Sequence, residues 1–156
     1  MSALTRRLAA LGLLLGGTGA TLADCTVSAV STSFGSYDPL GAVAVDGAGS
    51  VSVSCQFLIG VLVGYTIQLS TGSGGSYAPR SLSGTGYPLN YNLYTNAGRT
   101  SVWGDGSAGT ATVSDGYLIS VLVPVVRNYT VYGRLPAGQN VPPGSYADTI
   151  VVTVNY

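Results

Sequence analysis

The sequence predicts an all-β protein, an antiparallel sandwich of the immunoglobulin-like type, on three observations. No window after residue 23 sustains a helical period, whereas several short segments alternate apolar and polar residues, as half-buried strands do. Turn-forming Gly, Ser, Pro and Asp separate these segments, and Gly alone occurs 23 times. Several short strands at this spacing, with no internal repeat, indicate one sandwich domain rather than a solenoid or a helical fold.

The individual strands are justified by their alternation. Strands are expected at 25–30 and 128–136, and a short one at 109–114. The clearest ones carry inward-facing apolar sets, which are Val51, Val53 and Cys55 in 50–57, Tyr65, Ile67 and Leu69 in 64–71, and Leu89, Tyr91 and Leu93 in 88–95. The last expected strand, 144–156, faces Ile150, Val152 and Val154 one way. A chain that stops on such a strand offers an edge for another polypeptide to pair with.

Two apolar runs stand out from this alternation. They are "FLIGVLVG" at 57–64, which includes Leu58, Ile59, Val61 and Leu62, and "YLISVLVPVV" at 117–126. As hairpin tips they would present an exposed apolar patch suited to adhesion. As strands extended into the interior they would be buried, and the sequence leaves both interpretations open.

The first 23 residues are expected to be a secretory signal peptide. Arg6 and Arg7 precede the apolar run "LAALGLLLGG", and Thr21 and Ala23 supply small residues ahead of a cut at Asp24. This run is too short and too rich in Gly for a membrane-spanning helix of about 20 residues. The mature chain, 24–156, is therefore expected to be one secreted domain without a transmembrane segment.

The charged residues exclude several classes of function. Beyond the signal peptide there are four Arg and six Asp, and the chain has no Lys, Glu or His. Nucleic-acid binding is excluded because no basic patch can neutralise phosphates. Without imidazole or paired acids, no enzyme activity, metal site or cofactor is expected. The eleven Tyr and Trp103 leave a carbohydrate-binding module as an alternative.

The two cysteines, Cys25 and Cys55, are expected to form a disulfide because the chain enters an oxidising compartment. The alternative is lipidation of Cys25 within "LADC". Asp24 argues against it, since the residue before a lipidated cysteine is small and uncharged. Lipidation would also leave Cys55 without a partner.

Four segments together carry a family resemblance. They are "NYNLYT" at 90–95, "VWGDG" at 102–106 and "VYGRLPAGQ" at 131–139, followed by the terminal "GSYADTIVVTVNY". This combination resembles the spore coat protein U domain, which is shared with subunits of archaic chaperone–usher pili. The resemblance spans essentially the whole mature chain. It implies that Arg99, Trp103 and Asp105 are signature residues of the fold rather than a site.

The resemblance implies an incomplete sandwich that lacks its last strand. In such proteins a periplasmic chaperone lends a strand, and in the fibre a neighbouring pilus subunit's N-terminal extension replaces it. The expected partners are therefore that chaperone, an outer-membrane usher and other pilus subunits. The expected location is the cell surface, and the expected role is attachment and biofilm formation. The residues expected to line the donor-strand groove are Val27 and Phe34 on one wall and Ile150, Val152, Val154 and Tyr156 on the other.

One feature departs from a repeating fibre subunit. After cleavage at Ala23, only Asp24 would precede Cys25, so the mature chain is expected to accept a strand but not to donate one. That favours a position at the fibre tip or a role as a non-fibrous spore or cell coat protein.

Overall fold

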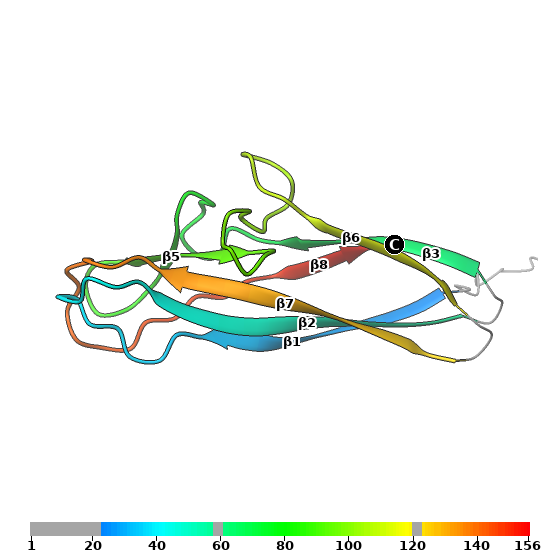
Figure 1. Cartoon of the computed structure of the whole chain (residues 1–156), viewed down its shortest axis with the longest axis horizontal. Helices are drawn as coiled ribbons and strands as arrows, with labels where there is room; N and C mark the ends of the chain where they lie inside the picture. The colour runs from blue at the N-terminus through cyan, green and yellow to red at the C-terminus, as the bar shows by residue number, and fades with distance from the viewer. Residues whose placement is uncertain (1–22, 58–60, 120–122) are drawn as a thin grey trace, which may run out of the picture.

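Two antiparallel β-sheets face each other in an elongated sandwich (Figure 1). The computed structural model describes residues 23–57, 61–119 and 123–156, and every regular element in these ranges is a strand. The five-stranded sheet has the order β1–β2–β7–β5–β4 and the three-stranded sheet the order β6–β3–β8. The strands are β1 Ala23–Ser33, β2 Val45–Phe57, β3 Val61–Leu69, β4 Arg80–Leu82, β5 Leu89–Tyr94, β6 Val113–Ile119, β7 Val125–Leu135 and β8 Val152–Asn155. The predicted all-β immunoglobulin-like sandwich is confirmed.

The core lies between the sheets, where alternation places it. All nine residues expected to face inward from β2, β3 and β5 are buried, with Val53, Cys55 and Ile67 at 0% exposure. β2 is an inner strand of its sheet, since it pairs with β1 on one side and with β7 on the other. Nowhere in the described ranges does a helix have the length and apolar character required to cross a membrane.

Several strand boundaries differ from expectation. The run 117–126 is not one element, because β6 ends at Ile119 and β7 begins at Val125, just after Pro124, which cannot donate a ladder hydrogen bond. The segment 109–114 gives only the start of β6 and a single bridge from Ala111 to Trp103. The short strand β4, Arg80–Leu82, has too few residues to show a period, and the sequence does not reveal it.

The disulfide joins β1 to β2. Cys25 and Cys55 are Cα partners in the antiparallel register, with their Cα atoms 4.1 Å apart. The bond therefore ties an edge strand to its neighbour within the same sheet and bridges no distance between the sheets.

Apart from Val123 and Pro124, the described residues of the two apolar runs lie in strands. Leu62 and Leu118 are Cα partners across β3 and β6 and are 77% and 73% exposed, whereas their neighbours Val63 and Tyr117 are buried. Full burial of these runs is therefore incorrect. Leu58 and Ile59 lie outside the described residues, as does the side chain of Val61.

Candidate functional site: an open groove between the sheets

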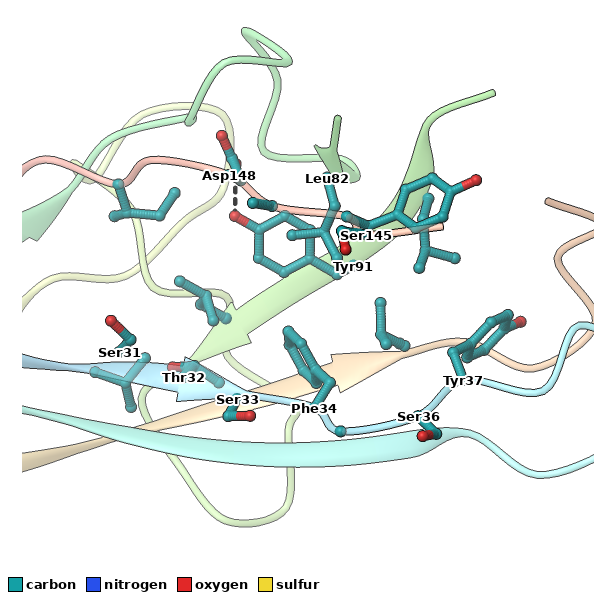
Figure 2. A pocket seen from close by; sticks show the side chains of 18 of the residues that line it. Ser31, Thr32, Ser33, Phe34, Ser36, Tyr37, Leu82, Tyr91, Ser145 and Asp148 are labelled. Atoms are coloured by element: carbon teal, nitrogen blue, oxygen red, sulfur yellow. Dashed lines mark hydrogen bonds between the residues drawn. The ribbon is translucent and has the colours of Figure 1, made fainter. Parts of the chain in front are cut away.

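A groove of about 1020 Å³ opens on one long side of the sandwich (Figure 2). One wall is the second half of β1 and residues 34–39, and the other is the chain from 141 into β8. Core side chains that reach the groove between the walls include Val51, Leu69, Leu89, Tyr91, Leu93, Val131 and Leu135. These side chains are themselves buried, whereas Phe34, Ile150 and Val152 on the walls are only partly buried, and the groove between the walls is where a further strand would lie.

The groove is open because both of its walls are sheet edges. Within the described part of the chain, β1 pairs only with β2, and β8 pairs only with β3. Each of the two strands therefore has one edge whose backbone N–H and C=O groups lack a strand partner. Such edges are templates for an added strand.

The chain leading into β8 keeps its strand pattern well beyond the regular strand. Tyr146, Ile150 and Val152 are partly buried against the core, whereas Ala147 and Val151 are exposed. The strand expected over 144–156 is regular only at Val152–Asn155. Upstream of it the chain makes isolated contacts, such as Ser70 N–H to Val151 O at 3.0 Å and the Ser83–Ala147 bridge. The alternation is correct, and what this stretch lacks is a continuous neighbouring strand.

Half of the expected groove residues lie in the groove. Phe34, Ile150 and Val152 line it, whereas Val27, Val154 and Tyr156 are not among its lining residues. Val27 lies opposite the fully buried Val53 and so points to the inner side of its sheet. It is nevertheless 42% exposed. The sandwich is therefore uncovered along β1 even beyond the groove.

Val154 and Tyr156 lie farther along the opposite wall. Val154 is partly buried against the core, and Tyr156, the last residue, is 62% exposed. Because β1 and β8 run in opposite directions, these residues and Val27 lie toward the same end of the sandwich (Figure 1).

A polar tie joins the floor of the groove to one of its walls. The Tyr91 hydroxyl donates to Asp148 Oδ2 at 2.6 Å, and Asp148 Oδ1 accepts from Ser73 N–H, Ser73 Oγ and Thr149 N–H at 2.8, 2.6 and 2.8 Å. Burial raises the pKa of Tyr91, and its bond to Asp148 raises it further. Burial also acts to raise the pKa of Asp148, but the bonds from Ser73 and Tyr91 outweigh it and hold that pKa below its usual range. The tie fixes the wall to β5.

A buried arginine supports the same region from below. Arg80 is fully buried, with Nε and Nη2 donating to Ser70 O at 3.0 and 2.8 Å, Nη2 to Trp103 O at 2.7 Å and Nη1 to Asn92 Oδ1 at 2.8 Å. Its guanidinium lies 4.9 Å from the centre of the Tyr77 ring. Three segments distant in sequence are thereby held together beside Leu69, which lines the groove.

The three signature residues, Trp103, Asp105 and Arg99, make contacts within the fold. Trp103 is 0% exposed and its indole N–H donates to Ile67 O at 3.1 Å, so no face of its ring is open to a sugar. This corrects the idea of a carbohydrate platform built on Trp103. Asp105 Oδ1 accepts from Ser107 N–H at 2.9 Å in a turn. Arg99 lies 3.2 Å from Asp46.

Some lining residues went unnoticed in the sequence. Tyr146 shares the alternation of Ile150 and Val152, so extending that pattern four residues upstream would have found it. Tyr37 donates to Pro136 O and accepts from Gln139 N–H, both at 2.8 Å, and no local pattern predicts this contact across 99 residues. No group of three or more His, Cys, Asp or Glu suited to a metal ion occurs among the described residues.

Comparison with known proteins places this architecture in a family. Residues 15–153 match the spore coat protein U domain. The chain belongs to the spore coat protein U family. One member, "Protein U" of Myxococcus xanthus, is 37% identical over 134 residues, which cover 80% of this chain and 70% of that protein.

A solved structure shares the fold of this spore coat protein U chain. It is a complex of the chaperone CsuC with the tip adhesion subunit CsuE, from archaic chaperone–usher Csu pili of Acinetobacter baumannii. The TM-score is 0.52 at 21% identity, and the match covers 86% of this chain. The chain spans 40% of the length of the matched chain. At this identity the likeness is one of fold.

Proposed function

We propose that this protein is a non-enzymatic structural subunit of a surface fibre of the chaperone–usher type. Its groove would be completed by a strand from another polypeptide. The observation that carries the proposal is the groove itself, which reaches down to core side chains between two strand edges that have no strand partner in the described part of the chain. An inserted strand would pair its backbone with these edges and place alternate side chains on the floor.

The family and the fold neighbour support the choice of partners. The neighbour is a pilus subunit captured with its chaperone. By the same logic, a periplasmic chaperone would fill this groove first, and neighbouring pilus subunits would fill it after passage through an outer-membrane usher. The protein would then be secreted through the periplasm, after removal of residues 1–23, and remain at the cell surface.

Co-expression with and without a periplasmic chaperone tests the proposal. Ile150→Asp places a charge on the groove wall, whereas Val151→Asp places one on the exposed face of the same segment. We expect the wild type and Val151→Asp to co-purify with the chaperone and Ile150→Asp to be lost. A wild-type chain that accumulates alone, as a stable monomer with a filled core, would contradict the proposal.

We propose in addition that the protein attaches the fibre to surfaces, in biofilm formation, from a tip position. The support is the exposed cross-strand pair Leu62 and Leu118 on β3 and β6. Together with Leu58, Ile59 and Val61, Leu62 belongs to the apolar run in which adhesive residues are expected. Leu62→Ser with Leu118→Ser should reduce binding of cells to hydrophobic surfaces without reducing secretion, and unchanged binding would count against this role.

N-terminal sequencing of the secreted protein tests the tip position separately. A mature start at Asp24 would leave no segment ahead of β1, which begins at Ala23, to donate to a neighbour. A start well before residue 20 would supply such a segment and favour a place within the rod.

The second candidate is a spore or cell coat protein without a fibre. It is favoured by the family's description and by the 37% identity to Protein U. The two functions differ in chaperone dependence. A coat protein of this kind would be secreted in normal amounts from cells that lack the chaperone.

A further inference from the structure

We infer that a hollow on the outer face of the three-stranded sheet binds a neutral saccharide through Asp105, Gln68 and Thr153. The hollow has a volume of about 350 Å³, near the lower end of the range for small-molecule sites. Thr153 lines the hollow, whereas the preceding Val152 lines the groove, so the two sites lie on opposite faces of β8. The inference therefore goes beyond the proposed function and needs no inserted strand.

The base of the hollow offers side chains that can both donate and accept. Gln68 of β3 and Thr153 of β8 are Cα partners, so no strand edge is free between them. Gln68 Nε2 donates to Asp105 O at 3.2 Å and its Oε1 accepts from Asn155 Nδ2 at 3.3 Å, which leaves one amide hydrogen and one lone pair for a ligand. The Thr153 hydroxyl has no hydrogen-bond partner in the described part of the chain. Such a base suits a ligand rich in hydroxyl groups better than it suits a peptide backbone.

Asp105 supplies a strong acceptor at the rim. Its Oδ1 accepts from Ser107 N–H and Ser107 Oγ at 2.9 and 2.6 Å, which orients the carboxyl group and leaves Oδ2 for a ligand. The bonds from Ser107 hold the pKa of Asp105 below its usual range, so the group is ionised. The nearby Tyr77 hydroxyl does not occupy Oδ2, because it donates to Leu69 O at 2.9 Å. Hydrogen bonds from hydroxyl groups to a carboxylate are stronger than those between neutral groups.

The charge and the apolar surface of the lining select the class of ligand. Among the described residues around the hollow, Asp105 is the only charged one, so phosphates, sulfates and acidic sugars are disfavoured. Val151, which is 60% exposed, and the mostly buried Tyr77 ring supply a small apolar area. A lipid or a drug-like apolar molecule would need a larger apolar lining. A neutral sugar ring combines hydroxyl groups with small C–H faces, and so fits both parts of the lining.

The buried network beneath the hollow holds its two rims. Arg80 donates to Ser70 O at 3.0 and 2.8 Å, at the base of the rim formed by residues 70–77. It also donates to Trp103 O at 2.7 Å, two residues before Asp105 on the other rim. Trp103 itself takes part only through its backbone, since its ring is buried. A site whose rims are fixed in advance loses little freedom when a ligand enters, so a few hydrogen bonds can give measurable affinity.

Binding of oligosaccharides to the purified secreted chain tests the inference. The probes are cello-, malto-, manno- and galacto-oligosaccharides, with oligogalacturonate as the acidic comparison, and calorimetric titration gives the affinities. We expect at least one neutral probe to bind in the micromolar to millimolar range and roughly tenfold more tightly than oligogalacturonate. Absence of binding by every neutral probe at millimolar concentration, or equal affinity for the acidic probe, would overturn the inference.

Three variants locate the site. Asp105→Asn keeps an acceptor for Ser107 but replaces the second carboxylate oxygen by an amide donor, and should weaken binding roughly tenfold. Thr153→Val removes a hydroxyl at nearly constant shape and should weaken binding several-fold. The matched control is Asp38→Asn, since Asp38 Oδ1 accepts from Leu40 N–H at 3.0 Å in a comparable turn but does not line the hollow.

The control variant should bind as the wild type does, and circular dichroism verifies that all three variants are folded. Unchanged affinity in both Asp105→Asn and Thr153→Val would overturn the inference, as would an equal loss in Asp38→Asn. None of these substitutions touches a residue that lines the groove, so either result would leave the proposed function standing.

Discussion

Replacement of Arg80 by Leu is expected to destabilise the domain strongly. The guanidinium is fully buried and donates four hydrogen bonds, two to Ser70 O and one each to Asn92 Oδ1 and Trp103 O. Leucine has similar bulk and no donors. The variant therefore leaves Ser70 O and Trp103 O without a donor, whereas Asn92 Oδ1 keeps the bond from Leu93 N–H at 3.1 Å.

The magnitude follows from these acceptors. Each buried acceptor left without a partner costs about 1–3 kcal/mol. Part of that cost is recovered because the variant no longer buries a charge whose hydrogen-bond partners are all neutral. With two such acceptors, the net loss in the free energy of unfolding should be about 2–5 kcal/mol. That is a large fraction of the roughly 5–15 kcal/mol that holds a domain folded.

Urea unfolding of the purified protein measures this loss through the transition midpoint and slope. The matched control is Arg127→Leu. Arg127 is exposed and contributes a stacking contact over the Tyr117 ring at 5.1 Å, so its loss should cost about 1 kcal/mol or less. Equal, small losses in the two variants would refute the reasoning that the buried network matters.

Three other variants probe the tie, the floor and the disulfide. Asp148 has a lowered pKa, so the stability that it contributes is present above the unfolded value of about 3.9 and is lost as pH falls through the folded value. Asp148→Asn should therefore flatten the loss of stability below pH ~4, and an unchanged acid transition would contradict this. Gly133→Ala should lower the free energy of unfolding by about 1–3 kcal/mol, because the added Cβ would lie 2.7 Å from the Phe34 ring. Gly64→Ala should cost less, because the nearest atom to its added Cβ is 4.0 Å away. The double change of Cys25 and Cys55 to Ser should lower stability by about 2–4 kcal/mol in the same unfolding assay, and the reduced wild type should behave alike.

Period-two alternation predicted most of this fold because the inner strands have one face toward the core. Val51, Val53 and Cys55 face inward for that reason alone. The same rule places Ile150 and Val152 on the groove wall. Alternation depends only on neighbours in sequence, so it can be recognised without knowledge of the rest of the molecule.

The features that sequence did not reveal depend on distant segments. Arg80 is a charged residue in a short strand, and its burial requires carbonyl groups from Ser70 and Trp103 that only the folded chain brings to it. The place of Phe34 at the centre of the groove depends on Gly47 and Gly133, which are far apart in sequence and adjacent across β2 and β7. Val27 points as expected, but nothing in its own segment shows that the groove ends before it.

The position of the disulfide has a mechanical consequence. A tensile load that enters at the beginning of β1 meets a covalent bond to β2 at Cys25, the third pair of the ladder, before it reaches the pairs from Thr26 to Ser33. β2 is the most extensively paired strand, so the load spreads into the interior of the sheet instead of peeling the edge away one bond at a time. The disulfide therefore anchors the edge strand β1 at the end where its separation from β2 would begin.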